Sequence, residues 1–393
     1  MIQIQFLDRN VVHALVPVFS MKPEKVIFLY DKDCVTHNLR QDISDTIKHR
    51  YPKTAMEFVQ ADMLHMHEIK RVLETVVEKY KDKEIQVDIT GGTEIMTACG
   101  MMAAQQFGWI PTYVDYDSSE VFQVFTLEKL ADVEHITIED YLRAIGGRVL
   151  SVSSCVPKEK EFEKLCGIAK AIFANERKWD EFFSYISRGY SSRGVMEFSM
   201  GEKKNDPDCR FILNLFLDNG YAIKIGNDCY RYASEAAKTY MTVSGIWLEL
   251  YIYMMAKQVY DEVYMSVNID WNDRDSCESR DNEIDVVIMH HSQPVFISCK
   301  MKPIVKETVY EVYAMAKRMG GDIAKAMVAT TDPLRKKEAE NFNRENGILM
   351  RMEKMKVGFI EADDFQHSAP KEVFRKALHK IKCYFSDERQ SLR

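Results

Sequence analysis

The sequence has no long hydrophobic run and no recognisable export signal. None of its 393 residues lies in an apolar stretch near the roughly 18 residues that cross a bilayer. The opening segment MIQIQFLDRN has the pattern of a strand followed by a polar turn, and it lacks the basic region and the cleavage site of a signal peptide. We therefore expect a cytoplasmic protein without a membrane partner.

Other absences concern cysteine pairs, positive charge and linkers. The nine cysteines are scattered and never spaced as C-x-x-C, which argues against a zinc site or a disulfide framework. The formal net charge of −7 argues against a generally basic nucleic-acid-binding coat. No repeat or Pro/Gly/Ser-rich linker divides the chain. With 46% hydrophobic and 29% charged residues, the composition is that of a globular protein, and its length suits two or three domains.

The first unit, residues 1–146, alternates short apolar strands with helices. The expected strands are 2–6, 25–30, 55–60, 85–89 and 111–116, and the expected helices are 36–50, 66–80 and 94–107. A segment at 121–128 has the pattern of a further hairpin strand. Strands and helices alternating at this spacing predict a parallel, doubly wound α/β sheet.

Two further units follow. Residues 147–242 begin with lysine-rich helices and end in a helix and a small hairpin with its turn at 226–228. We interpret them as a small α+β connector resembling a winged helix. Residues 243–393 have the order helix, strand, hairpin, helix, strand, helix, strand, which predicts a domain with a mixed α/β sheet.

The strand ends of the first unit carry polar residues. In a doubly wound sheet, ligands bind outside the carboxyl ends of the strands. The residues there are Asp8, Arg9, Asn10, Asp31, Lys32, Thr90, Gly91, Gly92 and Thr93. The two glycines let the backbone approach a ligand, and Thr93 caps a helix whose free N–H groups attract an anion. A plain tight turn before a helix would use the same residues, so this motif alone leaves both interpretations open.

The third unit contains the hairpin NEIDVVIMHHSQPVFISCK, residues 282–300. Glu283 and Asp285 point to one face of its first strand, as Ser298 and Lys300 do on the second. Burying two carboxylates and a lysine is costly without a use such as binding a divalent metal, and oxygen ligands suit Mg²⁺ or Mn²⁺. A lysine there can orient the attacking water or neutralise phosphate charge. The alternative is a structural ion pair on an exposed sheet face.

The motif DITGGTEIM, directly after an apolar strand, resembles the CARF domain. CARF domains are CRISPR-associated, Rossmann-like sensors of cyclic oligoadenylates, and the resemblance covers residues 1–146. It implies a homodimer in which two such turns face a ring-shaped ligand, most often cyclic tetra-adenylate. The polar residues at the strand ends would then be the ligand-binding residues.

The third unit resembles the restriction-endonuclease-like domain of CARF-linked nucleases, the Can and Card effectors of type III CRISPR systems. The resemblance rests on SGIWLE, NEIDV, SCK and the GG turn in this order. That family has an Asp on one strand, Glu-x-Lys on the next and a helical Glu upstream, and Asp285, Lys300 and Glu249 match these positions. The resemblance implies a metal-dependent endonuclease that cleaves DNA or RNA in antiviral defence.

Ser298 departs from this pattern because it replaces the second metal-binding carboxylate. The Cys299 carbonyl and water can suffice beside Asp285 and Glu249, or a carboxylate can have moved to the next helix, where Glu307 and Glu311 lie four residues apart on one face. The third option is a catalytically dead site. We expect an active enzyme whose metal ligands are Glu249, Asp285, Cys299 and Glu311.

Two other functions remain open at this point. The first is a non-enzymatic regulator, gated by a ring nucleotide, that binds DNA through its connector and has a degenerate nuclease domain. The second is a ring nuclease that degrades its own activator in the CARF cleft.

Overall fold

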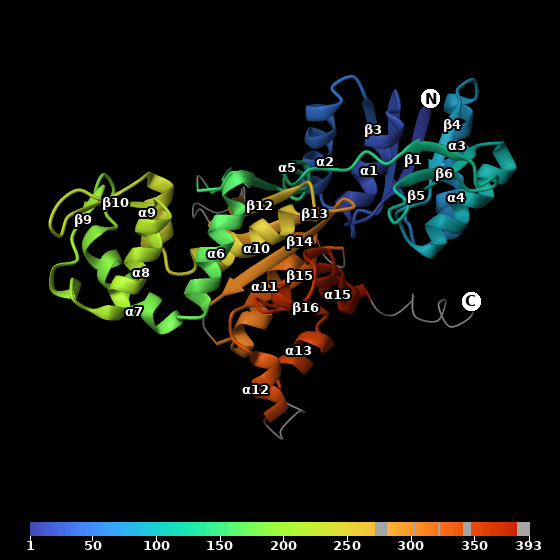
Figure 1. The fold of residues 1–393 in the computed structure, drawn as a ribbon. Helices are drawn as coiled ribbons and strands as arrows, with labels where there is room; N and C mark the ends of the chain where they lie inside the picture. Colours follow the sequence, from blue (N-terminus) through green and yellow to red (C-terminus); the bar gives the residue numbers. More distant parts are fainter. Residues whose placement is uncertain (154, 272–280, 302, 321–322, 341–346, 383–393) are drawn as a thin grey trace.

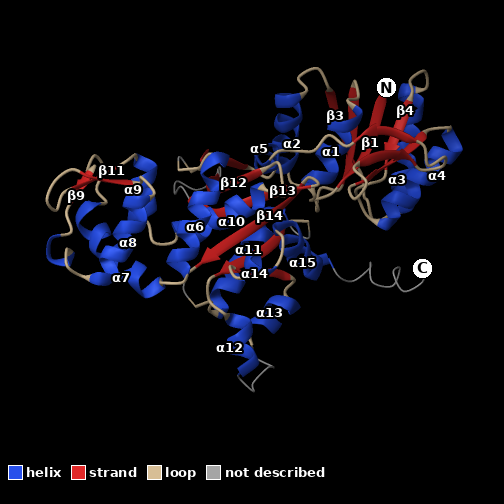
Figure 2. Ribbon diagram, viewed as in Figure 1, coloured by secondary structure: helices blue, strands red, loops and turns tan. Residues whose placement is uncertain are grey.

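The computed structural model describes residues 1–153, 155–271, 281–301, 303–320, 323–340 and 347–382 (Figure 1). This part of the chain contains a seven-stranded, a six-stranded and a three-stranded sheet. Figure 2 shows the seven-stranded sheet and the small sheet at opposite ends of the molecule, with the six-stranded sheet between them. None of the described helices is long and apolar enough to cross a membrane.

The first unit is a doubly wound sheet, as predicted. Its elements are β1 (Ile2–Leu7), α1 (Val11–Met21), β2 (Lys25–Tyr30), α2 (His37–Arg50), β3 (Ala55–Gln60), α3 (Met66–Tyr80), β4 (Ile85–Asp88), α4 (Glu94–Phe107), β5 (Ile110–Asp115), β6 (Glu120–Gln123), β7 (Lys129–Asp132) and α5 (Ile138–Ala144). The strand order is β3-β2-β1-β4-β5-β6-β7, with β1 to β5 parallel and β6 and β7 antiparallel. Separate apolar clusters bury α1 and α2 on one face and α3 and α4 on the other.

The polar turns of this unit follow from local hydrogen bonding. The side chains of Asn10, Thr36 and Thr93 accept backbone N–H groups at the starts of α1, α2 and α4. Gln3 and Gln5, buried in the central strand, satisfy each other in part because the Gln5 amide donates to the Gln3 side chain at 3.0 Å.

The connector is a small α+β unit. It contains η1 (Glu159–Glu161), α6 (Phe162–Phe173), α7 (Glu176–Tyr190), β9 (Glu197–Phe198), η2 (Gly201–Lys203), α8 (Pro207–Asp218), β10 (Ala222–Lys224), β11 (Tyr230–Tyr232) and α9 (Glu235–Thr242). The predicted turn at 226–228 joins β10 to β11, and β9 pairs on the other side of β11. Aromatic rings in tilted and edge-on contact with the buried Trp179 form its centre.

The third unit is built on the six-stranded sheet, order β16-β15-β14-β13-β12-β8. Its elements are β8 (Gly147–Ser151), α10 (Ile246–Lys257), β12 (Val263–Trp271), β13 (Asp281–His290), β14 (Gln293–Lys300), α11 (Lys306–Gly320), β15 (Lys325–Thr330), α12 (Leu334–Glu340), α13 (Ile348–Lys354), β16 (Val357–Glu361), α14 (Asp364–His367) and α15 (Pro370–Lys382). The pairs β14–β15 and β15–β16 are parallel and the others antiparallel. Strand β8, which the sequence grouped with the connector, therefore forms the edge of this sheet beside β12.

The first and third units share one apolar core. A single cluster contains residues of α1, α2 and α5 together with residues of β13, β14 and α11. At this junction the buried Tyr141 hydroxyl of α5 donates to the Met319 carbonyl in the last turn of α11 at 2.6 Å. The opposite face of the six-stranded sheet packs on α10 and shares a second cluster with the connector. The six-stranded sheet is thus in contact with both other units.

Candidate functional site

The hairpin opens into a fork at Asp285. Between the described residues of β13 and β14, the ladder runs from His290 and Gln293 to Val286 and Ile297 and ends there. Beyond this point the Asp285 carboxylate accepts the Cys299 backbone N–H at 2.6 Å. The side chain therefore takes over a hydrogen bond that a regular ladder would give to the backbone, and it stays at the branch of the two strands.

A second irregularity lies on the neighbouring strand. Ser266 of β12 has a φ of 48°, in the left-handed region that is uncommon for a non-glycine residue. The flanking pairs, Met265 with Val286 and Val267 with Ile284, place Ser266 opposite Asp285. Its hydroxyl donates to the Glu249 carboxylate at 2.9 Å. The hydrogen bond ties α10 to the fork.

Glu249 is a half-buried carboxylic acid on an otherwise apolar helix. Burial raises its pKa to about 7, and the nearby negative charge of Asp285 adds to this effect, while the Ser266 hydroxyl opposes it. Glu249 and Asp285 are therefore close enough to interact. Helix α10, which carries Glu249, packs on the face of the sheet opposite to α11. A cation between Glu249 and Asp285 would relieve this repulsion.

A cavity of about 440 Å³ opens on the α11 side of the fork. Its charged and hydroxyl side chains are Glu283, Asp285, Ser298, Lys300, Glu311 and Arg318. The Lys300 ammonium lies 3.7 Å from an Asp285 carboxylate oxygen, and the Ser298 hydroxyl is 3.4 Å from the same oxygen. Of the two alternative helical carboxylates, Glu311 lines this cavity and Glu307 does not.

The donors at the fork suit a hard divalent cation. Asp285 and Glu311 offer carboxylate oxygens and Cys299 a backbone carbonyl, which are the ligand types that Mg²⁺ and Mn²⁺ prefer. The Cys299 side chain is buried on the opposite face, and burial raises the pKa of its thiol. In the described part of the chain, however, no three His, Cys, Asp or Glu side chains converge tightly enough to hold a metal by themselves. Water or a substrate oxygen would have to complete the coordination.

At the end of β1, Asp8 holds the glycine turn in place. Its carboxylate accepts the backbone N–H groups of Asn10 at 2.6 Å and Gly92 at 3.0 Å, and His13 lies 3.6 Å away. Burial raises the pKa of Asp8, but the hydrogen bonds from His13 and Gly92 outweigh it and lower the pKa. Gly92 has a φ of 90°, and a Cβ there would meet Met96 and Phe6 at 2.9 Å. Glycine is thus required by the turn itself.

A cavity of about 820 Å³ lies beside Asp8 and extends to the third unit. Of the predicted ligand-binding residues it contacts Asp8, Arg9 and Asn10. The others lie outside its lining: Asp31, Lys32, Thr90, Gly91, Gly92 and Thr93. Several of these serve the fold, since Asp31 accepts two backbone N–H groups and the Thr90 hydroxyl accepts the Val114 N–H.

Two residues at these sites were missed by the sequence analysis. Arg318 lines both cavities, because it follows Glu311 by two helical turns and sits where α11 meets the first unit. Its position two helical turns after Glu311, on the same face of the expected helix, could have identified it. Ser266 carried no signal, since its φ comes from the strand irregularity. Asp88, the first residue of the motif DITGGTEIM, is buried at the end of β4, and burial raises its pKa to about 6.

Two segments match family models. Residues 235–365 match the Card1-like endonuclease domain, and residues 1–118 match an HFX_2341-like N-terminal domain. No curated protein sequence matches the chain.

Solved structures with the same fold cover nearly the whole chain at low identity. Protein VC1899 from Vibrio cholerae has a TM-score of 0.76 at 17% identity, covering 97% of this chain and 98% of that one. Can2 from Sulfobacillus thermosulfidooxidans, solved with cyclic tetra-adenylate, has a TM-score of 0.66 at 18% identity, covering 97% and 99%. A type III CRISPR defence DNA nuclease activated by cyclic oligoadenylate has a TM-score of 0.52 at 15% identity, covering 84% of this chain and 45% of that one.

The raised pKa of Glu249 predicts a pH-dependent stability. In the folded protein the pKa of Glu249 is about 7, whereas the ordinary glutamate pKa, which applies to the unfolded chain, is 4.5. The favourable contribution of this group to the free energy of unfolding is therefore complete below pH 4.5 and is lost as pH rises towards 7. Without divalent metal, Glu249→Gln should stabilise the protein at pH 8 by on the order of 2 kcal/mol and much less at pH 5. Urea denaturation at both pH values measures this, and an equal difference at the two would contradict it.

The sequence-based resemblance is confirmed by the Card1-like endonuclease match at residues 235–365 and by the fold that the chain shares over nearly its whole length with Can2.

Proposed function

We propose that this protein is a metal-dependent endonuclease of type III CRISPR antiviral defence, switched on by a cyclic oligoadenylate. The observation that carries the proposal is the strand fork, where Asp285, Lys300 and Glu311 line one open cavity inside the segment that matches the endonuclease model. Cyclic tetra-adenylate is the proposed activator, since Can2, of the same fold, was solved with that ligand. The proposed substrate is a DNA or RNA phosphodiester.

The side chains at the fork would have different roles in hydrolysis. A bound Mn²⁺ or Mg²⁺ would supply Lewis-acid charge and a more acidic water at neutral pH. Asp285, Glu311 and the Cys299 carbonyl are the donors that would hold it, with Glu249 behind them. Lys300 stabilises negative charge that develops on the phosphate, and Arg318 from α11 gives the cavity a second cation to position the strand.

The first unit would bind the activator beside Asp8. Arg9 and Asn10 line the cavity there, and Lys317 and Arg318 of α11 line its other wall, so a polyanionic ring would meet cations from both units. The activator and the nucleic-acid cavity would then share one helix. Activator binding at one end of α11 can change the position of its other end only if the activator has different affinities for two arrangements of that helix.

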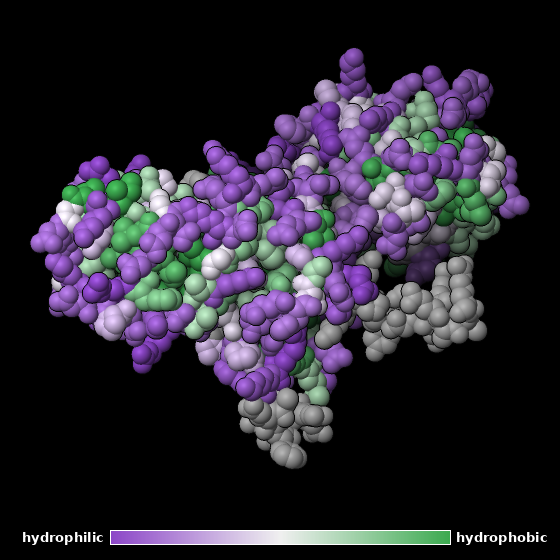
Figure 3. All heavy atoms as spheres, viewed as in Figure 1, coloured by the Kyte–Doolittle hydropathy of each residue, from purple (hydrophilic) through white to green (hydrophobic). Residues whose placement is uncertain are grey.

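A homodimer is part of this proposal. Figure 3 shows hydrophilic side chains over most of one face, with apolar ones gathered over the connector and over part of the first unit. In the first unit, Leu64, Met66 and Met102 are 68%, 47% and 56% exposed. Met66 and Met102 border a groove between α3 and α4. A second copy related by a two-fold axis and covering this patch would bury it.

One observation favours a different function. Ser298, in place of a carboxylate, points its hydroxyl at Asp285, and the described acids form no ready-made metal cluster. The alternative is a ring-nucleotide-gated, DNA-binding regulator with a degenerate nuclease domain. Ser298→Glu distinguishes the two: a silent wild type that gains cleavage through this substitution would identify the regulator.

The first prediction for this function separates cleavage from activator binding. Plasmid DNA and single-stranded RNA are incubated with Mn²⁺, with and without cyclic tetra- or hexa-adenylate. The wild type should cleave only when activator and metal are both present, and Asp285→Asn should lower the rate by about a hundredfold or more. Calorimetry should show unchanged activator binding by the variant, because Asp285 lies outside the ligand cavity. Cleavage by Asp285→Asn at the wild-type rate would refute the proposed site.

A matched pair on α11 tests the relocated carboxylate. Glu311→Gln and Glu307→Gln make the same chemical change at two exposed positions one helical turn apart, and only Glu311 lines the cavity. Glu311→Gln should reduce the cleavage rate about as strongly as Asp285→Asn, whereas Glu307→Gln should leave it nearly unchanged. Equal rates for the two variants would show that Glu311 supplies no metal ligand.

A further inference from the structure

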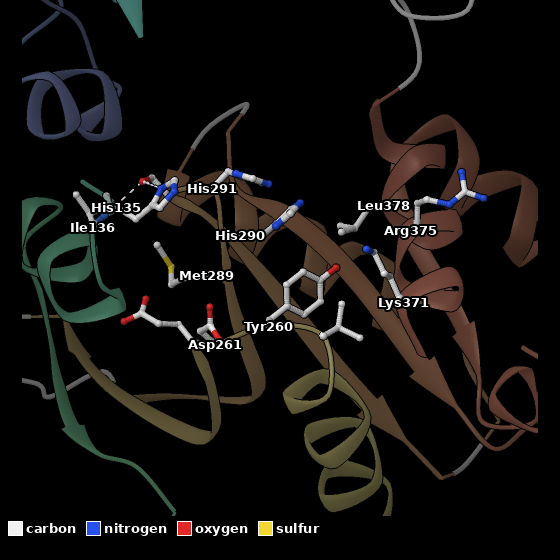
Figure 4. Close-up of a pocket in the computed structure, with 13 residues that line it drawn as sticks. His135, Ile136, Tyr260, Asp261, Met289, His290, His291, Lys371, Arg375 and Leu378 are labelled. Carbon is white, nitrogen blue, oxygen red and sulfur yellow. Dashed lines mark hydrogen bonds between the residues drawn. The ribbon is translucent and has the colours of Figure 1, made fainter. Parts of the chain in front are cut away.

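A third cavity, of about 770 Å³, lies at the far end of the hairpin from the fork. Figure 4 shows that it opens where four segments meet: His135 and Ile136 of the first unit, the segment 259–262 after α10, the hairpin tip at His290 and His291, and helix α15. The tip is five residues along β13 from Asp285, about 17 Å at the usual rise per residue. This cavity shares no lining residue with the fork cavity or the cavity beside Asp8.

One end of this cavity is cationic. Lys371 and Arg375 lie one turn apart near the start of α15, where the helix dipole adds positive potential. Within the described parts of the chain, neither side chain makes a hydrogen bond or ion pair. The next basic residue, Lys376, is different: it pairs with Glu372 at 2.8 Å and does not line the cavity. Among the described residues neither charge has an ion-pair partner, although Arg375 lies near enough to Glu372 to help Lys376 lower the pKa of that carboxyl. Two such charges beside a cavity favour an anionic ligand.

The wall beside the cations is aromatic and can donate a hydrogen bond. Tyr260 packs edge-on against His290 and Phe374, with ring centroids 5.1 and 5.7 Å apart. Burial raises the pKa of Tyr260 to about 12, so its hydroxyl remains a donor at neutral pH. In Figure 4 the Lys371 ammonium points towards this hydroxyl and the His290 ring. An ammonium and a phenol hydroxyl therefore face the same space, next to an imidazole.

The other end of the cavity is acidic. Asp261 lies on the far side of Tyr260 from Lys371 (Figure 4), and Glu262 also lines the cavity there. Burial raises the pKa of Glu262, and its one described hydrogen-bond donor is the Tyr264 hydroxyl at 3.4 Å. Carboxylates in this position accept hydrogen bonds from N–H groups of a ligand. The cavity thus offers cations, an aromatic wall and acceptors in sequence, and its volume is in the range of small-molecule sites.

We propose that this cavity is a nucleotide site that takes a nucleoside diphosphate. The phosphates lie on Lys371 and Arg375, the hydroxyl of Tyr260 donates to them, and the base presents its N–H groups to Asp261 and Glu262. The site is distinct from the activator and nucleic-acid cavities and does not depend on nuclease activity.

The lining of this cavity includes residues of both the first and the third unit. At the cavity the Ser292 hydroxyl lies 3.0 Å from a His135 ring nitrogen, and the Ser119 hydroxyl lies 3.2 Å from one of His291. These contacts join the hairpin tip to the turn before β6 and to the segment after β7. A bound nucleotide would add further contacts across this junction and should raise the melting temperature of the whole chain.

Calorimetry of the full chain with ADP, GDP, adenosine and pyrophosphate tests the site. ADP or GDP should bind, and Lys371→Ala should weaken that binding at least about tenfold by removing a charge-assisted contact. Two controls should bind as the wild type does: Lys376→Ala, on the same helix but outside the cavity, and Arg9→Ala, in the cavity beside Asp8. Adenosine and pyrophosphate should each bind more weakly than the diphosphates.

Three results would overturn the proposal. One is no binding of ADP or GDP at millimolar concentration. Another is equal affinity in the Lys371→Ala and Lys376→Ala variants, which would place the nucleotide elsewhere. The third is pyrophosphate binding as tightly as the nucleoside diphosphates, which would show that the nucleoside does not contribute to binding. Lys371 and Lys376 are both exposed, so neither substitution should disturb folding.

Discussion

The hydrogen bond from the Cys299 N–H to the Asp285 carboxylate, at 2.6 Å, is the constraint on which the candidate active site depends. It satisfies a backbone donor that lost its partner where β13 and β14 separate, and it holds one carboxylate oxygen at the branch of the strands. The second oxygen is left for other ligands. Ser298 and Lys300 extend along β14 from this point, and α11 closes the cavity above them. The Asp285 carboxylate is positioned by the Cys299 N–H and does not need the side chain at position 298 for this. A serine there is therefore compatible with the geometry of the fork.

The shared core gives the first unit a physical route to this cavity. Helix α11 packs in the same apolar cluster as α1 and α5, and the Tyr141 hydroxyl holds the carbonyl of Met319 near its end. Arg318, one residue before Met319, lines the cavity beside Asp8 and the cavity at the fork. A rearrangement beside Asp8 that moves α11 would therefore also move Glu311 and Arg318. Contact of this kind is a necessary condition for coupling, and variant measurements must supply the coupling energy.

The positions of residues in locally regular helices and strands could be predicted from the sequence. The positions of residues that depend on pairing with a distant part of the chain could not. Strand alternation was enough to group Asp285, Ser298 and Lys300, and the glycine pair located the turn before α4. The membership of β8 in the third sheet could not be read, because its partner strand lies more than a hundred residues away in the sequence. The polar residues at the strand ends were only partly informative. Asp31 and Thr90 are residue types that often contact ligands, but their side chains accept hydrogen bonds from backbone N–H groups of their own unit.

Metal binding at the fork is the central claim, and electron paramagnetic resonance of Mn²⁺ tests it without requiring a substrate or an activator. Titrating Mn²⁺ into the full chain and measuring the free ion gives the number and affinity of bound ions. The account predicts at least one Mn²⁺ per chain, with binding lost or greatly weakened in Asp285→Asn and unchanged in Glu307→Gln. If the wild type binds no Mn²⁺, or if Asp285→Asn binds it as tightly as the wild type, the fork is not a metal site.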